Sequence, residues 1–451
     1  MVKKSLDLNT CGVFKGILKL GVPAVITALF DEINGVVDTI FMGQFLGESA
    51  VASMSIVMPF LVFASALAFL FCEGASISIG RYLGAEDYEN SSKTASLTIK
   101  ATLAASIILG IICFSFAKTM VGLFHLDAQT AMYSVKYIRY FSLGLPLFMS
   151  SFLFIKFLYT EGFSGQTLRL TIIQVAANII LNWIFLGFFG WGVEGAVAGT
   201  LISFLLQAVL AATFLIKRSN HIKIKNVKFD KAYFKEIVPL GLPSFFTMIL
   251  LAVTITIQSK IISGFGSSAL GVQTIFENIF SVFSSISTGI MNAALVLMAY
   301  STGAGNRKRF METLKKSAVI VFITSVIINL PLVFCPDIVG LVFTESANIL
   351  DKLKIPMLIL GLTSPFIFTT NTILFAMQPI GMEKTSTLIF ALQQLVLFVP
   401  LILILKNYGF NQTMAAQPSA EVIGGFITLA IIPVFMKTVK KRFANSTHGE
   451  E

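Results

Sequence analysis

A series of long apolar segments, recurring over almost the whole chain, most limits the folds this sequence can adopt. Windows of about 20 apolar residues are long enough to cross a bilayer as α-helices. They predict twelve transmembrane helices, at residues 17–44, 51–79, 95–117, 137–160, 169–189, 194–216, 236–262, 269–299, 315–336, 350–376, 385–405 and 418–437. With 55% hydrophobic and only 12% charged residues among 451, the sequence predicts an all-α, multi-pass membrane protein without a separate soluble domain.

The basic residues give these predicted helices an orientation. If the N-terminus is cytoplasmic, the cytoplasmic segments hold about 25 of the 33 Lys and Arg residues, and the opposite loops hold about six. We therefore expect both termini on the cytoplasmic side of the cell (inner) membrane. This topology explains the net charge of +10. The basic loops favour contact with membrane lipids, anionic ones above all, over binding to nucleic acid.

The two halves of the sequence resemble each other. Motifs recur at an offset of about 220 residues, with Leu20, Gly21 and Pro23 matched by Leu240, Gly241 and Pro243, Gly84-Ala85 by Gly303-Ala304, Gly162 by Gly381, and Gln174 by Gln393. Because six is even, duplicating six helices preserves their orientation and predicts two pseudo-symmetric six-helix bundles with a cavity between them. The predicted division is an N-terminal lobe at 1–216, a basic cytoplasmic linker at 217–235, a C-terminal lobe at 236–440 and a polar tail at 441–451.

The first predicted helix carries acidic residues that a membrane span rarely contains. At 100° per residue, Asp31, Asn34 and Asp38 fall on one stripe, with the two aspartates roughly 10 Å apart along the axis. Glu32 lies about 100° around the helix from this stripe. A carboxylate in mid-membrane costs about 2.5–3.5 kcal/mol even on insertion scales. The stripe should therefore face a wet cavity or a protein partner rather than lipid.

Amides and one lysine in the same half can converge on these acids. The fifth predicted helix presents Gln174, Asn178 and Asn182 on one face, and the fourth carries Lys156 near its inner end. In a structural interpretation, Lys156 pairs with one of the aspartates and holds the bundle together. In a functional interpretation, an amide-flanked carboxylate binds and releases a proton, or binds Na⁺ together with the amide oxygens. The residues leave the choice between H⁺ and Na⁺ open.

The second half is less acidic. Glu277 is its only well-placed carboxylate, on the polar face of the eighth predicted helix, where it either has a functional role or pairs with an amide. Lys260 lies near the outer end of the seventh helix, where its side chain can reach the interface. Glu73, deep in the second helix, allows the same two interpretations as Glu277.

Nothing in the sequence points to catalysis. The three histidines, His125, His221 and His448, fall in predicted loops or the tail without metal-ligand spacing. The four cysteines show no CxxC pair, and neither a Walker A motif nor a GxSxG elbow is present. We expect a protein that is not an enzyme, has no cofactor or metal site, and is driven by an ion gradient rather than by ATP.

Four segments carry a resemblance to a known family. They are LGVPAVITALFDEINGVVDTIFMGQFLGESAVASMS from Leu20, IGRYLGAEDYENSSK from Ile79, ANIILNWIFLGFFGWGVEGAVAGT from Ala177 and STGAGNRKR from Ser301. Together they resemble the multidrug and toxic compound extrusion (MATE) family over residues 15–437. The resemblance implies two six-helix lobes and export of cationic, lipophilic compounds in exchange for H⁺ or Na⁺ by alternating access. It also implies that the acid of the first helix's VDT segment, here Asp38, is the central coupling residue.

The chain departs from the family pattern at other acidic positions. Where many members pair the first-helix acid with an Asn and an Asp on the fifth helix, this sequence has Asn178 and Asn182. The acids that another branch places on helices seven and ten are matched here by Gln258 and Asn371. Because the second carboxylate is missing, Asp38, Asp31 and Glu32 become the main candidates for ion coupling. The same departure favours H⁺ slightly over Na⁺ as the coupling ion.

The resulting hypothesis is a monomeric antiporter for amphipathic cations. Asp38 would be the protonation switch, Asp31 and Glu32 would tune it or contact substrate, and its hydrogen-bonding shell would consist of Asn178, Asn182, Gln174 and Lys156. One alternative is a flippase of lipid-linked saccharides, which needs several basic residues in its cavity to hold a pyrophosphate. An integral-membrane enzyme is the third class, and it would require His/Asp or His/Cys groupings that the sequence lacks.

Overall fold

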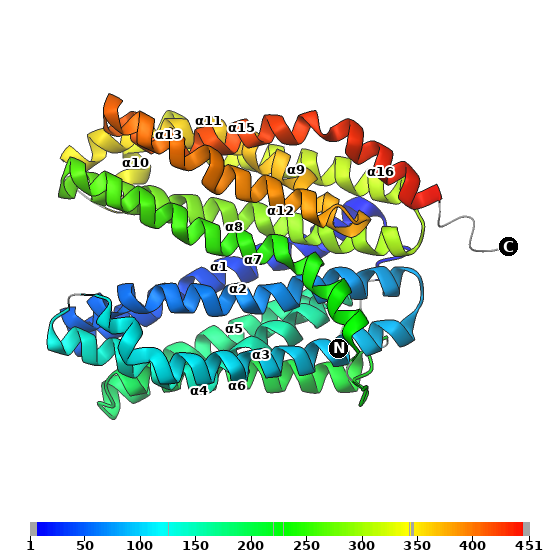
Figure 1. Ribbon diagram of the computed structural model, residues 1–451, viewed down its shortest axis with the longest axis horizontal. Coiled ribbons are helices and arrows are strands. Elements are labelled where there is room, and N and C mark those ends of the chain that lie inside the picture. Colours follow the sequence, from blue (N-terminus) through cyan, green and yellow to red (C-terminus); the bar gives the residue numbers. More distant parts are fainter. Residues whose placement is uncertain are drawn as a thin grey trace. The chain divides into compact units, whose positions relative to one another are not determined.

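The computed structural model describes residues 7–124, 126–219, 221–228, 230–341, 343 and 347–444, and within these ranges it contains helices and connecting turns but no strand (Figure 1). The first half contains α1 (Val13–Leu46), α2 (Glu48–Gly84), α3 (Tyr88–Gly122), α4 (Ala128–Thr160), α5 (Ser164–Asn182), the π-helix η1 (Trp183–Phe188) and α6 (Val193–Arg218). The second half contains α7 (Lys231–Ile262), η2 (Ser263–Phe265), α8 (Ser267–Gly303), α9 (Arg307–Phe334), α10 (Pro336–Leu341), α11 (Ala347–Met377), η3 (Gln378–Ile380), α12 (Glu383–Ala391), the π-helix η4 (Leu392–Leu397), α13 (Phe398–Leu405), η5 (Lys406–Tyr408), α14 (Phe410–Met414), α15 (Ala416–Ala430) and α16 (Ile432–Ala444).

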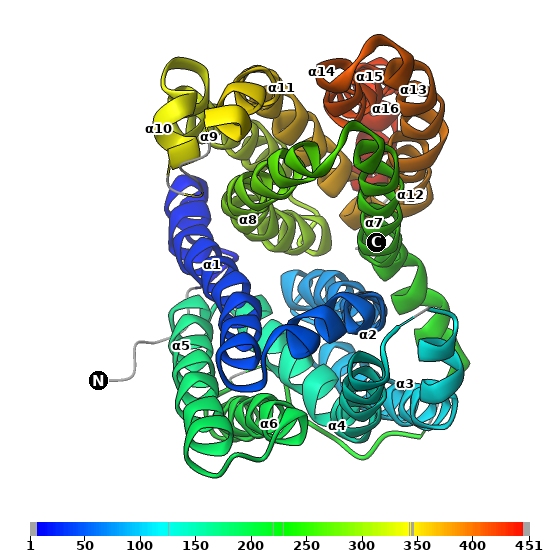
Figure 2. The same cartoon turned by 90° about the vertical axis from the view of Figure 1, so that its left-hand side faces the viewer.

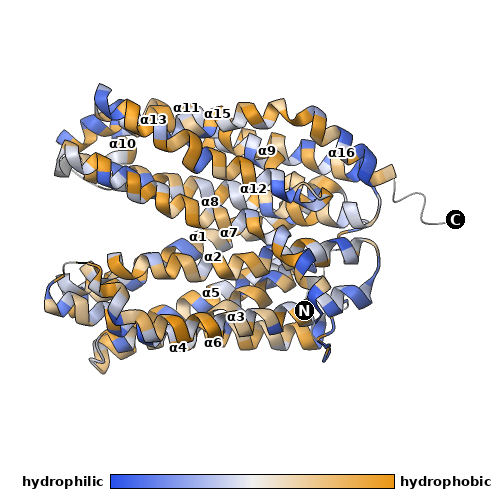
Figure 3. Cartoon of the chain, in the orientation of Figure 1, coloured by the Kyte–Doolittle hydropathy of each residue, from blue (hydrophilic) through white to orange (hydrophobic). Residues whose placement is uncertain are grey.

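The prediction of a twelve-span, all-α membrane protein is confirmed. In the described part of the chain, eleven helical segments are long and apolar enough to cross a bilayer, and α15 with α16, bent by 49°, makes the twelfth. Most of the helices are longer than the apolar windows that predicted them. The reason is that their polar ends continue beyond the apolar centre, as the hydropathy colouring of Figure 3 shows.

The chain forms two compact units that do not coincide with the two sequence halves. The first unit includes Ile26–Gly241, and the second joins Asn9–Val25 to the residues from Leu242 onward. The beginning of α1 therefore belongs to the second unit, and the beginning of α7 belongs to the first. The lobes were predicted at 1–216 and 236–440. They differ from the observed units because the first residues of α1 pack with the second half and the first residues of α7 pack with the first half.

Glycines at close backbone contacts explain this exchange. In the first unit, a Cβ atom on Gly74 of α2 would collide with the backbone oxygen of Ile237 in α7. In the second unit, a Cβ atom on Gly289 of α8 would lie 2.7 Å from the backbone nitrogen of Val25 in α1. Only glycine lets two helices approach so closely, and sequence hydropathy cannot reveal which helix will be the partner.

The internal repeat is visible in the turns. After α2 the chain turns at Glu86, with a φ of 59°, and after α8 it turns at Gly305, with a φ of 63°. The next residue caps the following helix in both halves. Asp87 accepts a hydrogen bond from the backbone N–H of Asn90, and Asn306 accepts one from the backbone N–H of Arg309. The duplication predicted from sequence thus extends to turn geometry.

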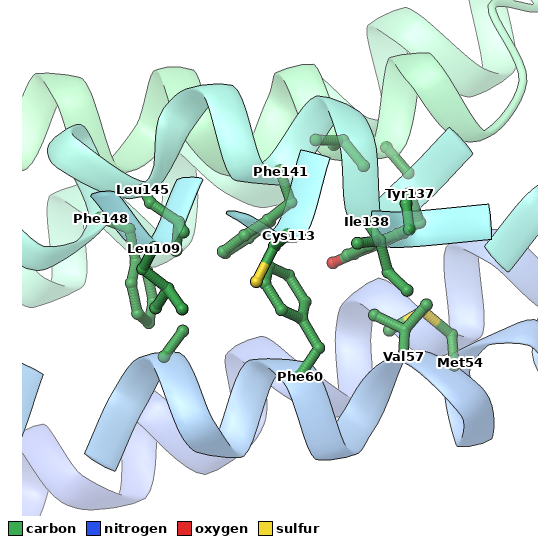
Figure 4. Packing of buried hydrophobic residues seen from close by; sticks show 14 of the residues in the cluster. Met54, Val57, Phe60, Leu109, Cys113, Tyr137, Ile138, Phe141, Leu145 and Phe148 are labelled. Atoms are coloured by element: carbon green, nitrogen blue, oxygen red, sulfur yellow. The ribbon is translucent and has the colours of Figure 1, made fainter. Parts of the chain in front are cut away.

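The first unit encloses a core rich in aromatic residues, contributed mainly by α2, α3, α4 and α6. Figure 2 shows these helices as ribbons, and Figure 4 shows part of the core, with labelled side chains from α2, α3 and α4. Phe141 of α4 packs edge-on against Phe60 of α2, with ring centroids 5.9 Å apart, and Phe148 packs against Phe204 of α6 at 5.0 Å. Such edge-to-face pairs stabilise a fold beyond the area they bury, by about 0.5–1.5 kcal/mol each. The first pair joins α2 to α4, and the second fixes α6 relative to α4. Helix α6 in turn carries one of the residues of the candidate site.

The segment between α6 and α7 is bound to the first unit through Glu161, a buried residue directly after α4. Its Oε1 accepts hydrogen bonds from Ser219 Oγ at 2.6 Å and from the backbone N–H groups of Ile222 at 2.9 Å and His221 at 3.1 Å. Burial raises the pKa of the Glu161 carboxyl, and these donors oppose the rise. The carboxylate thus fixes the start of the connection.

Helix α3 holds the rest of this segment. Ser92 Oγ accepts a hydrogen bond from the backbone N–H of Lys223 at 3.0 Å, and Ser96 Oγ accepts one from that of Lys225 at 2.9 Å. Ser92 and Ser96 are four residues apart on a helix, a rise of about 6 Å, and Lys223 and Lys225 are two residues apart on an extended chain, a rise of about 6.6 Å. The two spacings match, so an extended segment can form both hydrogen bonds with α3. Of the linker predicted at 217–235, Lys217 and Arg218 lie in α6 and residues 231–235 lie in α7. The described residues between the two helices form a docked, extended connection that ends where α7 begins at Lys231.

Replacing Glu161 with Ala is expected to release the start of this segment. The backbone N–H groups of His221 and Ile222 lose a charged acceptor, and hydrogen bonds to charged groups contribute about 1.5–3 kcal/mol. Hydrogen exchange measured by mass spectrometry should therefore accelerate by about tenfold or more in the peptide that covers these amides. Peptides from α9 serve as the internal control. Unchanged exchange at His221 and Ile222 would contradict the role given to Glu161.

Candidate functional site

Asp38 is a buried carboxylate in α1 that is held by two other helices. Only 7% of its surface is exposed. Asn182 of α5 donates a hydrogen bond from Nδ2 to Asp38 Oδ1 at 2.6 Å, and Thr200 of α6 donates one from Oγ1 to Asp38 Oδ2 at 3.1 Å. Each carboxylate oxygen thus has one neutral donor. In the described part of the chain, no Lys, Arg or His forms an ion pair with Asp38.

A second residue of α5 connects these donors. Asn178 donates from Nδ2 to Thr200 Oγ1 at 3.2 Å, and its Oδ1 accepts from Asn182 Nδ2 at 3.3 Å. One turn earlier, Gln174 donates to Ser203 Oγ at 3.0 Å and to Asn34 Oδ1 at 3.4 Å. The four-residue spacing on α5 places all three amides on the face towards α1 and α6, as the sequence indicated.

The backbone around Asn182 is adapted to this contact. A Cβ atom on Gly199 of α6 would lie 2.6 Å from Asn182 Oδ1, so only glycine leaves room for the amide. Asn182 is also the last α-helical residue before the π-helix η1, and π-helical turns are frequent at functional sites. Its Oδ1 is buried and has no hydrogen-bond partner in the described structure. An amide oxygen of this kind can accept a further donor or coordinate a cation.

The structure does not place every predicted residue in this shell. The side chains of Asp31 and Glu32 are exposed, and the hydrogen-bond donors to Asp38 come from Asn182 and Thr200. Asn34 is only partly buried and joins the network through Gln174. The acidic stripe of α1 is thus divided into a buried end at Asp38 and an accessible end at Asp31.

The predicted position of Lys156 in the shell of Asp38 is corrected by the structure. Lys156 Nζ lies 2.6 Å from Glu73 Oε1, and both side chains are largely buried, with 13% and 6% exposed. The lysine also lies over the ring of Tyr159, 5.7 Å from its centroid. The intramembrane ion pair therefore joins α2 to α4, and neither aspartate of α1 takes part in it. Sequence could not select Glu73, because it lies 83 residues from Lys156.

In the second unit, Glu277 accepts a hydrogen bond from Gln273 Nε2 at 3.0 Å, and the same amide donates to Ser259 Oγ of α7 at 2.9 Å. Glu277 is partly buried. Two other polar residues, Thr200 and Glu421, were not predicted to belong to a site. Thr200 ends the GAVAGT segment one residue after Gly199, and Glu421 lies inside the twelfth apolar window. An acid within an apolar window is itself a signal for function.

The chemistry that this arrangement supports is reversible cation binding. Its functional groups are one carboxylate, two asparagine amides and a threonine hydroxyl, all of which offer oxygen atoms. No group of three or more His, Cys, Asp or Glu residues in the described ranges is arranged to hold a metal ion. The oxygens of the site suit a proton or a hard monovalent cation. Neutral hydrogen-bond donors can stabilise the carboxylate after the cation leaves.

The chain is similar to known proteins over most of its length. The MatE family model matches residues 23–184 and again residues 243–404. The multidrug export protein MepA of Staphylococcus haemolyticus is 24% identical over 428 residues, which cover 93% of each chain. Among solved structures, a MATE transporter in complex with MaL6 superposes with a TM-score of 0.90 at 19% identity, covering 97% of this chain and 100% of the other. A MOP superfamily transporter from Pyrococcus furiosus has a TM-score of 0.89 at 19% identity, covering 98% and 99% of the two chains.

The two separate matches to the family model correspond to the two halves of the internal repeat, and the matched structures share the fold over nearly the full length. The chain therefore belongs to the MATE family.

Proposed function

We propose that this protein is a secondary antiporter that exports cationic, lipophilic compounds from the cytoplasm in exchange for H⁺ or Na⁺ by alternating access. The observation that carries the proposal is Asp38, a membrane-buried carboxylate with two neutral hydrogen-bond donors and no cationic partner among the described residues. A charge buried in this way must be neutralised. A cation taken up on one side of the membrane and released on the other meets that requirement and supplies the driving force.

The export of drug-like cations rests on the family and on the names of the relatives. The staphylococcal MepA proteins are multidrug export proteins, and we extend that activity to this chain. The accessible Asp31 and Glu32 of α1 are suited to attract cationic substrates. We further propose that the protein acts as a monomer in the cell (inner) membrane with both termini in the cytoplasm, the orientation that the distribution of basic residues favours.

A flippase of lipid-linked saccharides is less well supported. It needs unpaired cations to hold a pyrophosphate, whereas Lys156, the lysine expected near the cavity, is engaged by Glu73. The sequence contains no Walker A motif for ATP binding. An ion gradient is therefore the proposed driving force.

Efflux of ethidium from proteoliposomes tests the proposal directly. With an imposed proton gradient or an imposed sodium gradient, we expect dye movement under at least one of them, because the ion that Asp38 handles must supply the energy. An ionophore that collapses the effective gradient should abolish the movement, and protein-free liposomes control for leakage. If a monodisperse protein moves no dye under either gradient, cation export is the wrong function.

Asp38→Asn should uncouple the transporter. The amide keeps the size of the side chain but cannot bind a proton or balance the charge of a cation. We expect gradient-driven efflux to fall by about tenfold or more, with dye binding largely retained. Dye fluorescence titration and efflux on the same preparation separate the two effects. Glu89→Gln, which removes an exposed acid paired with Lys93 on α3, is the matched control, and wild-type efflux by Asp38→Asn would refute the coupling role.

The Gly199→Ala substitution tests the amide shell while every polar residue of the site is kept. The added methyl must displace Asn182 from its 2.6 Å contact with Asp38. Disrupting such supporting contacts weakens ion binding by about 10–100-fold, so the ion concentration that gives half-maximal efflux should shift by about tenfold. Gly165→Ala on α5 is the control, because nothing lies within 4 Å of its Cβ position. An unshifted ion dependence in Gly199→Ala would show that Asn182 does not support the ion site.

A further inference from the structure

Three acidic residues in the described membrane spans are almost completely buried, and they differ in how their charge is balanced. Their exposed fractions are 7% for Asp38, 4% for Glu73 and 6% for Glu421. Glu73 forms an ion pair with Lys156. Asp38 belongs to the site described above. Glu421, on α15 of the second unit, forms no ion pair with a described residue and has no role in that site.

Among the described residues, the hydrogen-bond donors to Glu421 are two side-chain amides. Gln394 of η4 and Gln417 of α15 each donate from Nε2 to Glu421 Oε1, both at 3.4 Å. Gln394 is itself contacted by Thr254 of α7, whose Oγ1 lies within hydrogen-bond distance of two oxygens of Gln394. These are the side-chain Oε1 at 3.0 Å and the backbone oxygen at 3.1 Å. A π-helix such as η4 frees carbonyl groups from the α-helical pattern, which explains why the backbone oxygen of Gln394 is available.

No charged side chain from the elements around α15 compensates Glu421. The elements α13, α14 and η4 contribute no charged residue, and those of α7, α11, α12 and α16 form no ion pair or hydrogen bond with it in the described structure. These residues are Lys231, Lys235, Glu236, Lys260, Asp351, Lys352, Lys354, Glu383, Lys384, Lys437, Lys440, Lys441 and Arg442. Two long amide contacts do not offset the cost of a buried anion. Glu421 must therefore be neutralised by a bound cation.

A second buried group in this unit lacks a partner. Gln258 of α7 is fully buried, and its Oε1 has no hydrogen-bond partner in the described structure, although its Nε2 lies 3.9 Å from Met414 Sδ. Gln258 lies one helical turn after Thr254, and it occupies the repeat position of Asp38 at the offset of about 220 residues. The second unit thus has a neutral amide where the first has its acid. Its own buried acid comes from α15 instead.

We propose that Glu421 is a second ion-binding carboxylate, which takes up a monovalent cation, H⁺ or Na⁺, independently of Asp38. The inference rests on the proposed antiport function and extends it, because each unit then carries one exchangeable cation and a transport cycle moves two. Binding is a simple association in both cases. A proton adds to a carboxylate oxygen, or Na⁺ is held by the carboxylate and neighbouring amide oxygens, and no other bond changes.

Equilibrium ion binding to the purified protein tests this inference without requiring transport. Radioactive sodium binding is the Na⁺ arm, and proton uptake when a weakly buffered, sodium-free solution is brought from alkaline to neutral pH is the H⁺ arm, because exposed carboxyl groups stay ionised over that range. We expect Glu421→Gln and Asp38→Asn each to bind about one ion fewer than the wild type, and the double variant about two fewer. Undiminished ion binding by Glu421→Gln in both arms would overturn the inference.

Two further variants keep the test decisive. Glu312→Gln on α9 makes the same substitution in the same unit, but at an exposed ion pair with Lys316, and it must bind as many ions as the wild type. Should Glu421→Gln fail to yield folded protein, Glu421→Asp decides. The shortened carboxylate moves the charge away from both amides, so its ion affinity should fall by about tenfold, and an unchanged affinity overturns the inference.

Failure of this inference and failure of the proposed function give different results. If ethidium is not exported but Glu421→Gln still loses ions, the second site exists in a protein of another function. If export is gradient-driven but Glu421→Gln binds as many ions as the wild type, the antiporter works through Asp38 alone.

Discussion

The contact between the Asp38 carboxylate and its two neutral donors is the interaction on which the first unit depends. It joins α1, α5 and α6 through Asn182 and Thr200, in a region where water is scarce and an unpaired anion is expensive. The close approach of α5 to α6 at Gly199 makes the contact possible. The core of the unit is built mainly by α2, α3, α4 and α6, and the Asp38 contact adds α1 and α5 to it. A change in the charge of Asp38 therefore alters hydrogen bonds to both α5 and α6.

The duplicated halves have kept their turns but have distributed their charges differently. Glu86 and Gly305 share the same unusual backbone conformation at the same repeat position, which shows how closely the two backbones correspond. The acid of the first half is nevertheless replaced by Gln258 in the second, where Glu421 supplies a buried carboxylate from another helix. The two halves thus share their backbone turns, whereas single substitutions determine which helix carries the buried carboxylate.

Much of this fold could be predicted from sequence, because its main signals are local. Apolar windows gave the spans, and helical periodicity placed Gln174, Asn178 and Asn182 on one face together with the acid of α1. Interactions between distant segments were beyond that reasoning. Lys156 had several acids within plausible reach, and only packing selects Glu73. Thr200 has no charge and no distinctive spacing, so its role becomes visible only when α6 is placed beside α1.

The exchange of helix beginnings was also hidden from the sequence. The glycines at the two close contacts, Gly74 and Gly289, stand in the sequence, but an isolated glycine does not reveal which backbone approaches it. The second half of α1, with Asp38, belongs to the first unit, whereas its first half belongs to the second unit. Pro23 lies close to this boundary, and proline has no N–H to donate to the preceding turn. The hydrogen-bond ladder of α1 is therefore interrupted near the point where the helix passes from one unit to the other.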